Sequence, residues 1–140
     1  MKKESIFSPM LNSIDVRISD KTLTLHELSA LDYQAYQQYL SDIEQPIEPD
    51  EKDEKGIRAY NLAWQKVNVD AHSRLAAYGL KLSYPEIAIS DLHQELLANF
   101  NRVSIQLLHD KTAILSGLSL PNNEPDPENE VDEEEASPNE

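Results

Sequence analysis

The chain has 140 residues, no cysteine and a formal net charge of −14. This length suits one domain with one modest core, and the lack of cysteine excludes disulfides and zinc–thiolate sites and fits a reducing cytoplasm. No apolar run approaches the ~18 residues of a membrane-spanning helix, and residues 1–20 lack the apolar core of a signal peptide. Because nucleic-acid phosphates are bound by clustered Lys and Arg, the acidic balance argues against nucleic acid as a partner.

The first predicted element is a β-hairpin. Residues 1–13 carry weak signals and are expected to form a loose N-terminal arm. Apolar and polar residues then alternate over 14–18, a turn cluster occupies 19–21, and 22–25 can return as a second strand. An isolated hairpin is marginal in water, so the hairpin at 14–25 should pack against helices.

The stretch TLHEL, residues 24–28, joins the hairpin to the first predicted helix. A histidine beside a carboxylate could begin an active site, but the same residues have the S/T-x-x-E spacing of a capping box. We interpret Thr24 as the N-cap and Glu27 as the residue that returns a hydrogen bond to it. Leu23 and Leu28 then have the spacing of a hydrophobic staple, and His26 lies on the surface.

Two amphipathic helices are predicted next. The first should cover about 25–43, followed by an acidic, proline-containing loop over 44–55. The second should run from about residue 53 to 78, with Gly79 as the residue just past its end. Apolar residues at three- and four-residue steps predict the buried faces. These are Leu28, Leu31, Ala35, Tyr39 and Ile43 in the first helix, and Ile57, Tyr60, Trp64, Val67, Ala71, Leu75 and Tyr78 in the second.

A third helical stretch runs from about residue 85 towards 118. Ser90 is a second capping candidate, and Asn101 marks a position where the stretch either kinks or divides in two. Gly117 and Pro121 end the predicted ordered region. The expected fold is therefore mainly α, of the α+β type: a small N-terminal hairpin and three to four amphipathic helices in a compact bundle, one domain over 14–120.

Residues 121–140 differ in composition from the rest of the chain. They contain nine acids and four prolines but no Lys or Arg. Such a segment buries too little apolar surface to offset its ordering entropy, so we predict a disordered acidic tail. It is either a solubilising linker or a specific binding arm.

No pattern of reactive residues points to an enzyme. The three glycines are too far apart for a phosphate-binding loop, and the four histidines lack zinc spacing. Asp91 and Glu95 are four residues apart, but acids in a first helical turn are favoured by the helix dipole. A Ser-His-Asp arrangement assembled in three dimensions stays open. We predict no catalytic residue, no cofactor and no metal.

Aromatic residues are concentrated on the first two predicted helices. They either form the core and its amphipathic rim or anchor another protein, because Tyr and Trp are enriched in interfaces. The candidate partner-binding residues are Tyr36, Tyr39, Tyr60 and Trp64.

Three segments resemble the lambda-type phage minor tail protein G family, the tail assembly chaperones. VRISDKTLTLHELSAL (16–31) contains TLHELSAL, similar to the family's TLSELSAL. EKGIRAYNLAWQKVN (54–68) and QELLANFNRVSIQLLHDKTAILSGL (94–118) resemble two further family segments in the same order. Asn101 stands where the family pattern has proline, and SDK replaces a glycine-containing turn.

The resemblance implies a non-enzymatic role in phage assembly. Such proteins coat the long, helical, aggregation-prone tape measure protein in the host cytoplasm, recruit tail tube subunits and are absent from the finished virion. A longer product of a −1 ribosomal frameshift contacts the tail tube protein. The resemblance thus implies tape measure and tail tube proteins as partners and makes residues 121–140 a linker to the frameshifted extension; self-association stays open.

The position of such a frameshift can be hypothesised from codons. Pro138 and Asn139 can be encoded within a slippery heptamer close to the end of the sequence. The alternative function is a small acidic regulatory or inhibitor protein that binds a basic partner through residues 121–140.

Overall fold

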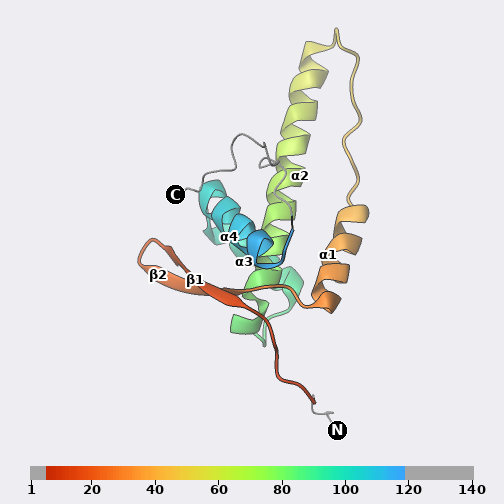
Figure 1. Ribbon diagram of the computed structural model, residues 1–140. Helices are drawn as coiled ribbons and strands as arrows, with labels where there is room; N and C mark the ends of the chain where they lie inside the picture. The colour runs from red at the N-terminus through yellow and green to blue at the C-terminus, as the bar shows by residue number, and fades with distance from the viewer. Residues whose placement is uncertain (1–5, 119–140) are drawn as a thin grey trace, which may run out of the picture.

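The computed structural model describes residues 6–118 and shows a mixed α+β fold (Figure 1). Residues 121–140, including Pro138 and Asn139, lie outside the described residues. A two-stranded antiparallel hairpin precedes four α-helices, which confirms the predicted order of elements. The elements are β1 (Ser13–Ile18), β2 (Lys21–His26), α1 (Ala30–Ser41), α2 (Glu54–Leu80), the 3-10 helix η1 (Lys81–Ser83), α3 (Ile89–Asn99) and α4 (Arg102–Leu115).

The hairpin follows the predicted alternation. Ile18 pairs with Lys21, and the two-residue turn between them places Ser19 at a positive φ of 55°. Val16 and its cross-strand partner Leu23 are buried against the helices, whereas Arg17 on the opposite face is exposed. One apolar face per strand therefore fixes the hairpin on the domain.

The core surrounds the C-terminal part of α2. One cluster joins both strands to α2, α3 and α4 and includes Leu25, Leu80 and Leu108. A second cluster joins Tyr36 of α1 to α2 and α4. Because this part of α2 has neighbours on all sides, every residue from Leu75 to Leu80 is buried.

The N-terminal part of α2 projects from the domain as an arm (Figure 1). The helix has 27 residues, so its length is about 40 Å at ~1.5 Å per residue. All its buried residues lie between Ser73 and Leu80. Among the described residues, it is the irregular segment 43–53 that runs beside the other half in Figure 1. The predicted compact bundle therefore forms only around the second half of α2.

Helix α1 starts later than predicted and buries a different face. Ser29 is its N-cap, and the Ser29 hydroxyl accepts a hydrogen bond from the Asp32 N–H at 3.1 Å. Leu31, predicted to be buried, is 74% exposed, and Ala35 is also exposed. Tyr36 is the buried residue of this helix, because α2 lies on that side.

The predicted capping box at Thr24 and Glu27 is wrong. Thr24 lies in β2, and its hydroxyl donates to the Asp15 carboxylate across the hairpin at 2.8 Å. The Glu27 carboxylate accepts from the backbone N–H of Asn12 at 2.7 Å. Pairing with β1 keeps these residues extended, so the same side chains that could cap a helix bind within the hairpin instead.

Some of the predicted ends of α2, α3 and α4 are confirmed and others are wrong. Asp53 is the N-cap of α2, close to the predicted start. Asn101 caps α4, so the third stretch divides in two at this residue. Gly117 follows α4 with φ 74°. Two predictions are wrong: Gly79 lies inside α2, and Ser90 lies inside α3, whose N-cap position is Ala88.

Candidate interaction surfaces

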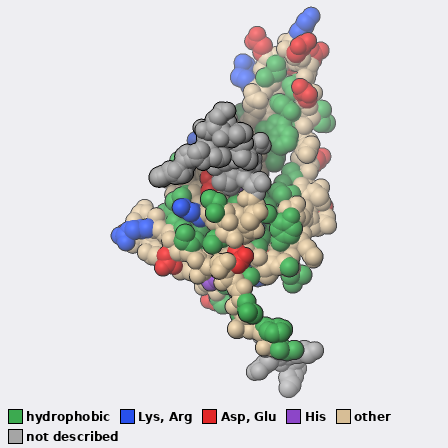
Figure 2. Space-filling model, in the orientation of Figure 1, with side chains coloured by type: hydrophobic (Ala, Val, Ile, Leu, Met, Phe, Trp, Pro, Cys, Tyr) green, Lys and Arg blue, Asp and Glu red, His purple; other side chains and the backbone are tan. Residues whose placement is uncertain are grey.

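The arm of α2 carries an aromatic pair. Tyr60 and Trp64, one helical turn apart, meet edge to face with ring centroids 6.3 Å apart and planes at 89°. Both are half-buried, as are Ile57 and Val67 on the same side, whereas Leu62 is 65% exposed. Figure 2 shows hydrophobic side chains gathered along this arm. The arm therefore presents apolar surface that the rest of the described chain leaves partly open.

The segment 43–53 adds both apolar and acidic groups to the arm. Pro49 approaches the first turn of α2, since a Cβ placed on Gly56 would lie 3.1 Å from it. Ile47 lies between Pro46 and Pro49 and is 90% exposed. Acidic side chains exposed around it are Glu44, Glu48, Asp50, Glu51 and Asp53. The arm thus combines an apolar surface with an acidic rim.

Tyr36 and Tyr39 lie apart from this arm, at the junction of α1 with the domain. Tyr36 is only 6% exposed, and its hydroxyl donates to the Ala71 carbonyl at 3.5 Å. Burial, with a smaller effect of Tyr39, raises the pKa of Tyr36 to about 12. Tyr39 is half-buried beneath the Arg74 guanidinium, 4.5 Å from the ring centroid. Ala71 follows Trp64 by seven residues, about 10 Å along α2, so the four predicted contact residues form two separate groups.

Histidines bridge the helices below the arm. The rings of His72 (α2) and His109 (α4) lie 4.2 Å apart, and His109 Nδ1 is 2.8 Å from the Asp110 carboxylate. Burial lowers the pKa of His72, and His109 lowers it further, while Asp110 opposes the shift. Burial likewise lowers the pKa of His93, with Arg74 adding to the effect. These pKa shifts favour neutral rings, which suits packing between helices.

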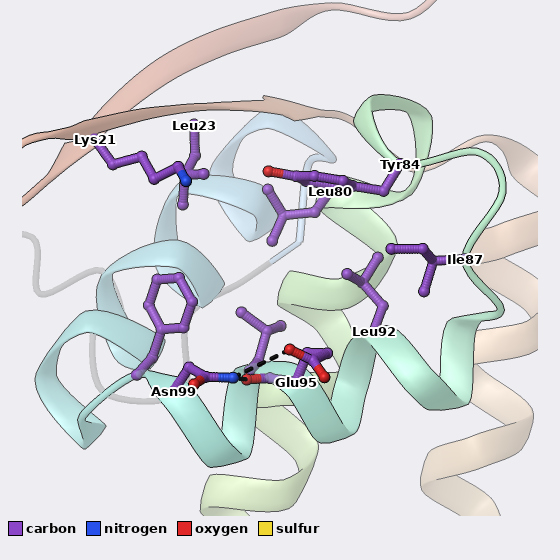
Figure 3. A pocket seen from close by; sticks show the side chains of 10 residues that line it. Lys21, Leu23, Leu80, Tyr84, Ile87, Leu92, Glu95 and Asn99 are labelled. Atoms are coloured by element: carbon purple, nitrogen blue, oxygen red, sulfur yellow. Dashed lines mark hydrogen bonds between the residues drawn. The ribbon is translucent and has the colours of Figure 1, made fainter.

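A cavity of about 290 Å³ lies between β2, the end of α2 and α3 (Figure 3). Its walls are apolar, and its rim carries Lys21 on the strand side and Glu95 and Asn99 on the helix side. The Asn99 amide donates to the Glu95 carboxylate at 3.1 Å. Such a hollow can accept apolar side chains of a partner. The apolar walls are formed by Leu23, Leu80, Tyr84, Ile87, Leu92, Leu96 and Phe100.

Over residues 6–118, no group of three or more His, Asp or Glu side chains is arranged to hold a metal ion. In the same range, none of the helices combines the length and the apolar character that crossing a membrane requires. The described residues form a small α+β domain whose distinctive features are apolar surfaces presented by helices and a hairpin.

A sequence model of the family described as bacteriophage lambda tail assembly chaperone, protein G, matches residues 10–135. The match covers most of the chain, so the chain belongs to this family, whose role is non-enzymatic. No curated protein and no solved structure matches the chain.

Two of these surfaces, the cavity beside α3 and the exposed Ile47, were not predicted from the sequence. The cavity beside α3 joins Leu23 to Leu96, residues more than seventy positions apart, and no local pattern connects them. Ile47 carried a local signal, because a single isoleucine between two prolines in an acidic loop has no buried face to join.

Proposed function

We propose that this chain binds and solubilises the tape measure protein of its phage through the α2 arm. The supporting observation is the arm itself: Tyr60 and Trp64 form an apolar face that the described domain covers only in part. An amphipathic helix of a partner could lay its apolar stripe along such a face. Aromatic anchors dominate binding energy in interfaces of this kind.

The arm also suits a partner that must be released later. A short helical face with an acidic rim binds through a few anchors rather than an extensive obligate interface. Tail tube subunits could then displace the chaperone as the tube polymerises. The acidic rim further favours partner helices whose apolar stripes are flanked by Lys or Arg.

Co-expression with the tape measure protein tests the proposal. We expect the wild-type chain to keep the tape measure protein soluble, and the double variant Tyr60→Ser/Trp64→Ser to weaken the complex about tenfold or more. The matched control is Asn61→Ser/Gln65→Ser, one residue further along the same helix on its exposed side. Equal solubility with both double variants would show that the arm is not the binding surface.

The alternative function places binding in residues 121–140. A variant that ends at residue 120 separates the two ideas, because it retains the whole arm. If this variant alone loses the tape measure protein, the acidic segment is the binding element and the arm proposal fails. Retained binding supports the arm.

The recruitment of tail tube subunits and the frameshifted form belong to the same proposal. We place the slip at the codons of Pro138 and Asn139, with the extension contacting the tail tube protein. The nucleotide sequence of the gene tests this hypothesis. It is wrong if the codons of Pro138 and Asn139 do not lie in a slippery heptamer, or if the overlapping −1 reading frame meets a stop codon at once. The chaperone would act in the host cytoplasm and be missing from purified virions, which mass spectrometry of virions can check.

A further inference from the structure

The backbone N–H and C=O groups of successive residues in strand β1 point alternately toward β2 and away from it. The Glu27 N–H donates to the Asn12 carbonyl at 2.9 Å, and these two residues follow the last pair of the strand register. In an antiparallel ladder every second residue makes such bonds. The even-numbered residues of β1 therefore turn their backbone groups toward β2. The residues whose backbone groups point away from β2 are Ser13, Asp15 and Arg17.

This outer edge of β1 is open, whereas the outer edge of β2 is covered. The Ser83 hydroxyl of η1 donates to the Thr24 carbonyl of β2 at 3.0 Å. On the β1 side, no hydrogen bond from residues 6–118 reaches the outward backbone groups. Helix α4 is the main further contact of β1 in that range. It packs on the apolar face, where Leu108 and Val16 share a core cluster, so it leaves the edge free.

We propose that two copies of this chain pair edge to edge through β1, antiparallel about a twofold axis at Val16. In this register Asp15 lies opposite the partner's Arg17, and Arg17 lies opposite the partner's Asp15. Opposite charges on facing strands attract, and like charges repel. Both residues belong to the outward-facing set, so each facing pair also exchanges two backbone hydrogen bonds.

The neighbouring registers are unfavourable. A shift of two residues in one direction places Asp15 opposite the partner's Asp15, and a shift in the other places Arg17 opposite the partner's Arg17. A shift of one residue would place the apolar and polar faces on opposite sides of the joined sheet. Charge complementarity therefore selects one register.

The same register continues the apolar surface. Val16 faces its own copy, and Ile14 faces the partner's Ile18, on the side of the sheet where the helices pack. A twofold axis perpendicular to the sheet places both copies of α4 on that side. Helix α4, which packs against this side of β1, also has an exposed apolar stripe. The stripe consists of Val103 (78% exposed), Leu107 (36%) and Ile114 (63%).

Charged residues on an edge strand commonly oppose pairing with other strands. Here the two charged residues, Asp15 and Arg17, have opposite signs and lie two residues apart on the same face. They therefore disfavour pairing with most strands but complement β1 of a second copy in antiparallel orientation. The partner that this edge fits is therefore a second copy of the chain.

Sedimentation of the full chain tests the proposal by charge exchange. We expect wild type to dimerise reversibly in the micromolar range, typical of a small interface (about 10–200 µM). Asp15→Arg and Arg17→Asp should each raise the dimer dissociation constant about tenfold or more. An equimolar mixture of the two variants should dimerise again, because every facing pair is then opposite in charge. The control Glu86→Arg makes the same change of charge as Asp15→Arg at an exposed residue away from β1, and it should dimerise like wild type.

Circular dichroism confirms that each variant folds, and the rescue by mixing excludes simple misfolding. A wild-type chain that stays monomeric at about 200 µM overturns the proposal, as does a mixture no better associated than its components. These results do not depend on tape measure binding, so either proposal can fail alone.

Cysteine cross-linking tests the register, since the natural chain has no cysteine. A mixture of Asp15→Cys and Arg17→Cys chains should oxidise to a covalent heterodimer, because facing residues lie about 5.5 Å apart. Neither variant alone should cross-link at a comparable rate. Faster cross-linking of a single variant would refute this register.

Discussion

Replacing Gly79 by alanine tests how closely α2 and α4 pack. Gly79 lies inside α2 with ordinary helical backbone, so the change imposes no backbone strain. A Cβ at this position would lie 2.4 Å from Thr112 Oγ1 and 2.9 Å from Thr112 Cγ2. Thr112 is fully buried in α4, and its β-branched side chain has few rotamers available in a helix. The Thr112 side chain, or helix α4 with it, must therefore shift away from α2.

The expected loss of stability is the difference of two effects. Forcing an extra methyl group into a packed core destabilises by about 1–3 kcal/mol, and contacts this short belong to the upper half of that range. Alanine is better than glycine inside a helix by about 1 kcal/mol. The net loss for Gly79→Ala should be about 1–2 kcal/mol, which corresponds to a fall of about 0.5–1 M in the urea midpoint.

The second variant, Thr112→Ala, makes the experiment specific. It removes both close atoms and a buried hydroxyl that has no hydrogen-bond partner among the described residues. In this background Gly79→Ala should become neutral or stabilising by up to about 1 kcal/mol, giving a coupling energy of about 1–3 kcal/mol in a double-mutant cycle. Urea unfolding followed by circular dichroism measures all four chains. If Gly79→Ala stabilises both backgrounds equally, the close approach of α2 and α4 at this point is wrong.

Three further predictions concern α1 and the buried titratable groups. Ser29→Ala should lower the free energy of unfolding by about 1 kcal/mol through loss of the N-cap, whereas Thr24→Val, compatible with a strand, should change it little; the reverse order in urea unfolding would contradict the observed helix start. Because the pKa values of His72 and His93 are lowered in the folded state, the unfolded chain binds their protons first as pH falls below about 6.5. Stability should therefore decline from pH 6.5 downward, and glutamine at both positions should reduce the decline between pH 6.5 and 5; an unchanged pH profile in urea unfolding would refute this. Because the pKa of Tyr36 is raised to about 12, the unfolded chain ionises first near pH 10 and stability should fall between pH 10 and 12; Tyr36→Phe should lack that part of the loss, and a parallel decline in both chains would refute the assignment.

The local part of the fold was predictable from particular residues. Alternation around Val16 predicted the hairpin, Asp53 marked the start of α2, and Asn101 marked the division that became α3 and α4. These signals act over a few residues, through side-chain direction and through hydrogen bonds to nearby backbone groups. The order of segments around them also carried the family resemblance, which the family match over residues 10–135 confirms.

The capping prediction failed because two local solutions compete at the same residues. Thr24 and Glu27 fit a capping box, but they also fit a hairpin in which Asp15 and Asn12 are their partners. Only pairing with β1, a contact between segments, decides between them. Gly79 shows the same limit, since a glycine near a helix end suits a C-terminal turn as well as a close contact with another helix.

The candidate interaction surfaces also have one part that is predictable from local sequence and one part that depends on contacts between distant segments. The amphipathic character of the helices and the positions of the aromatic residues along them follow from the amino-acid sequence alone, because helical periodicity is a local property. Which of these apolar faces are covered depends on how the helices and the hairpin pack against one another. Tyr36 is buried against α2, whereas Tyr60 and Trp64 remain on a projecting arm. Burial depends on neighbours that are distant in sequence: Leu28 is buried beside the end of α4, where its backbone N–H donates to the Ser116 hydroxyl.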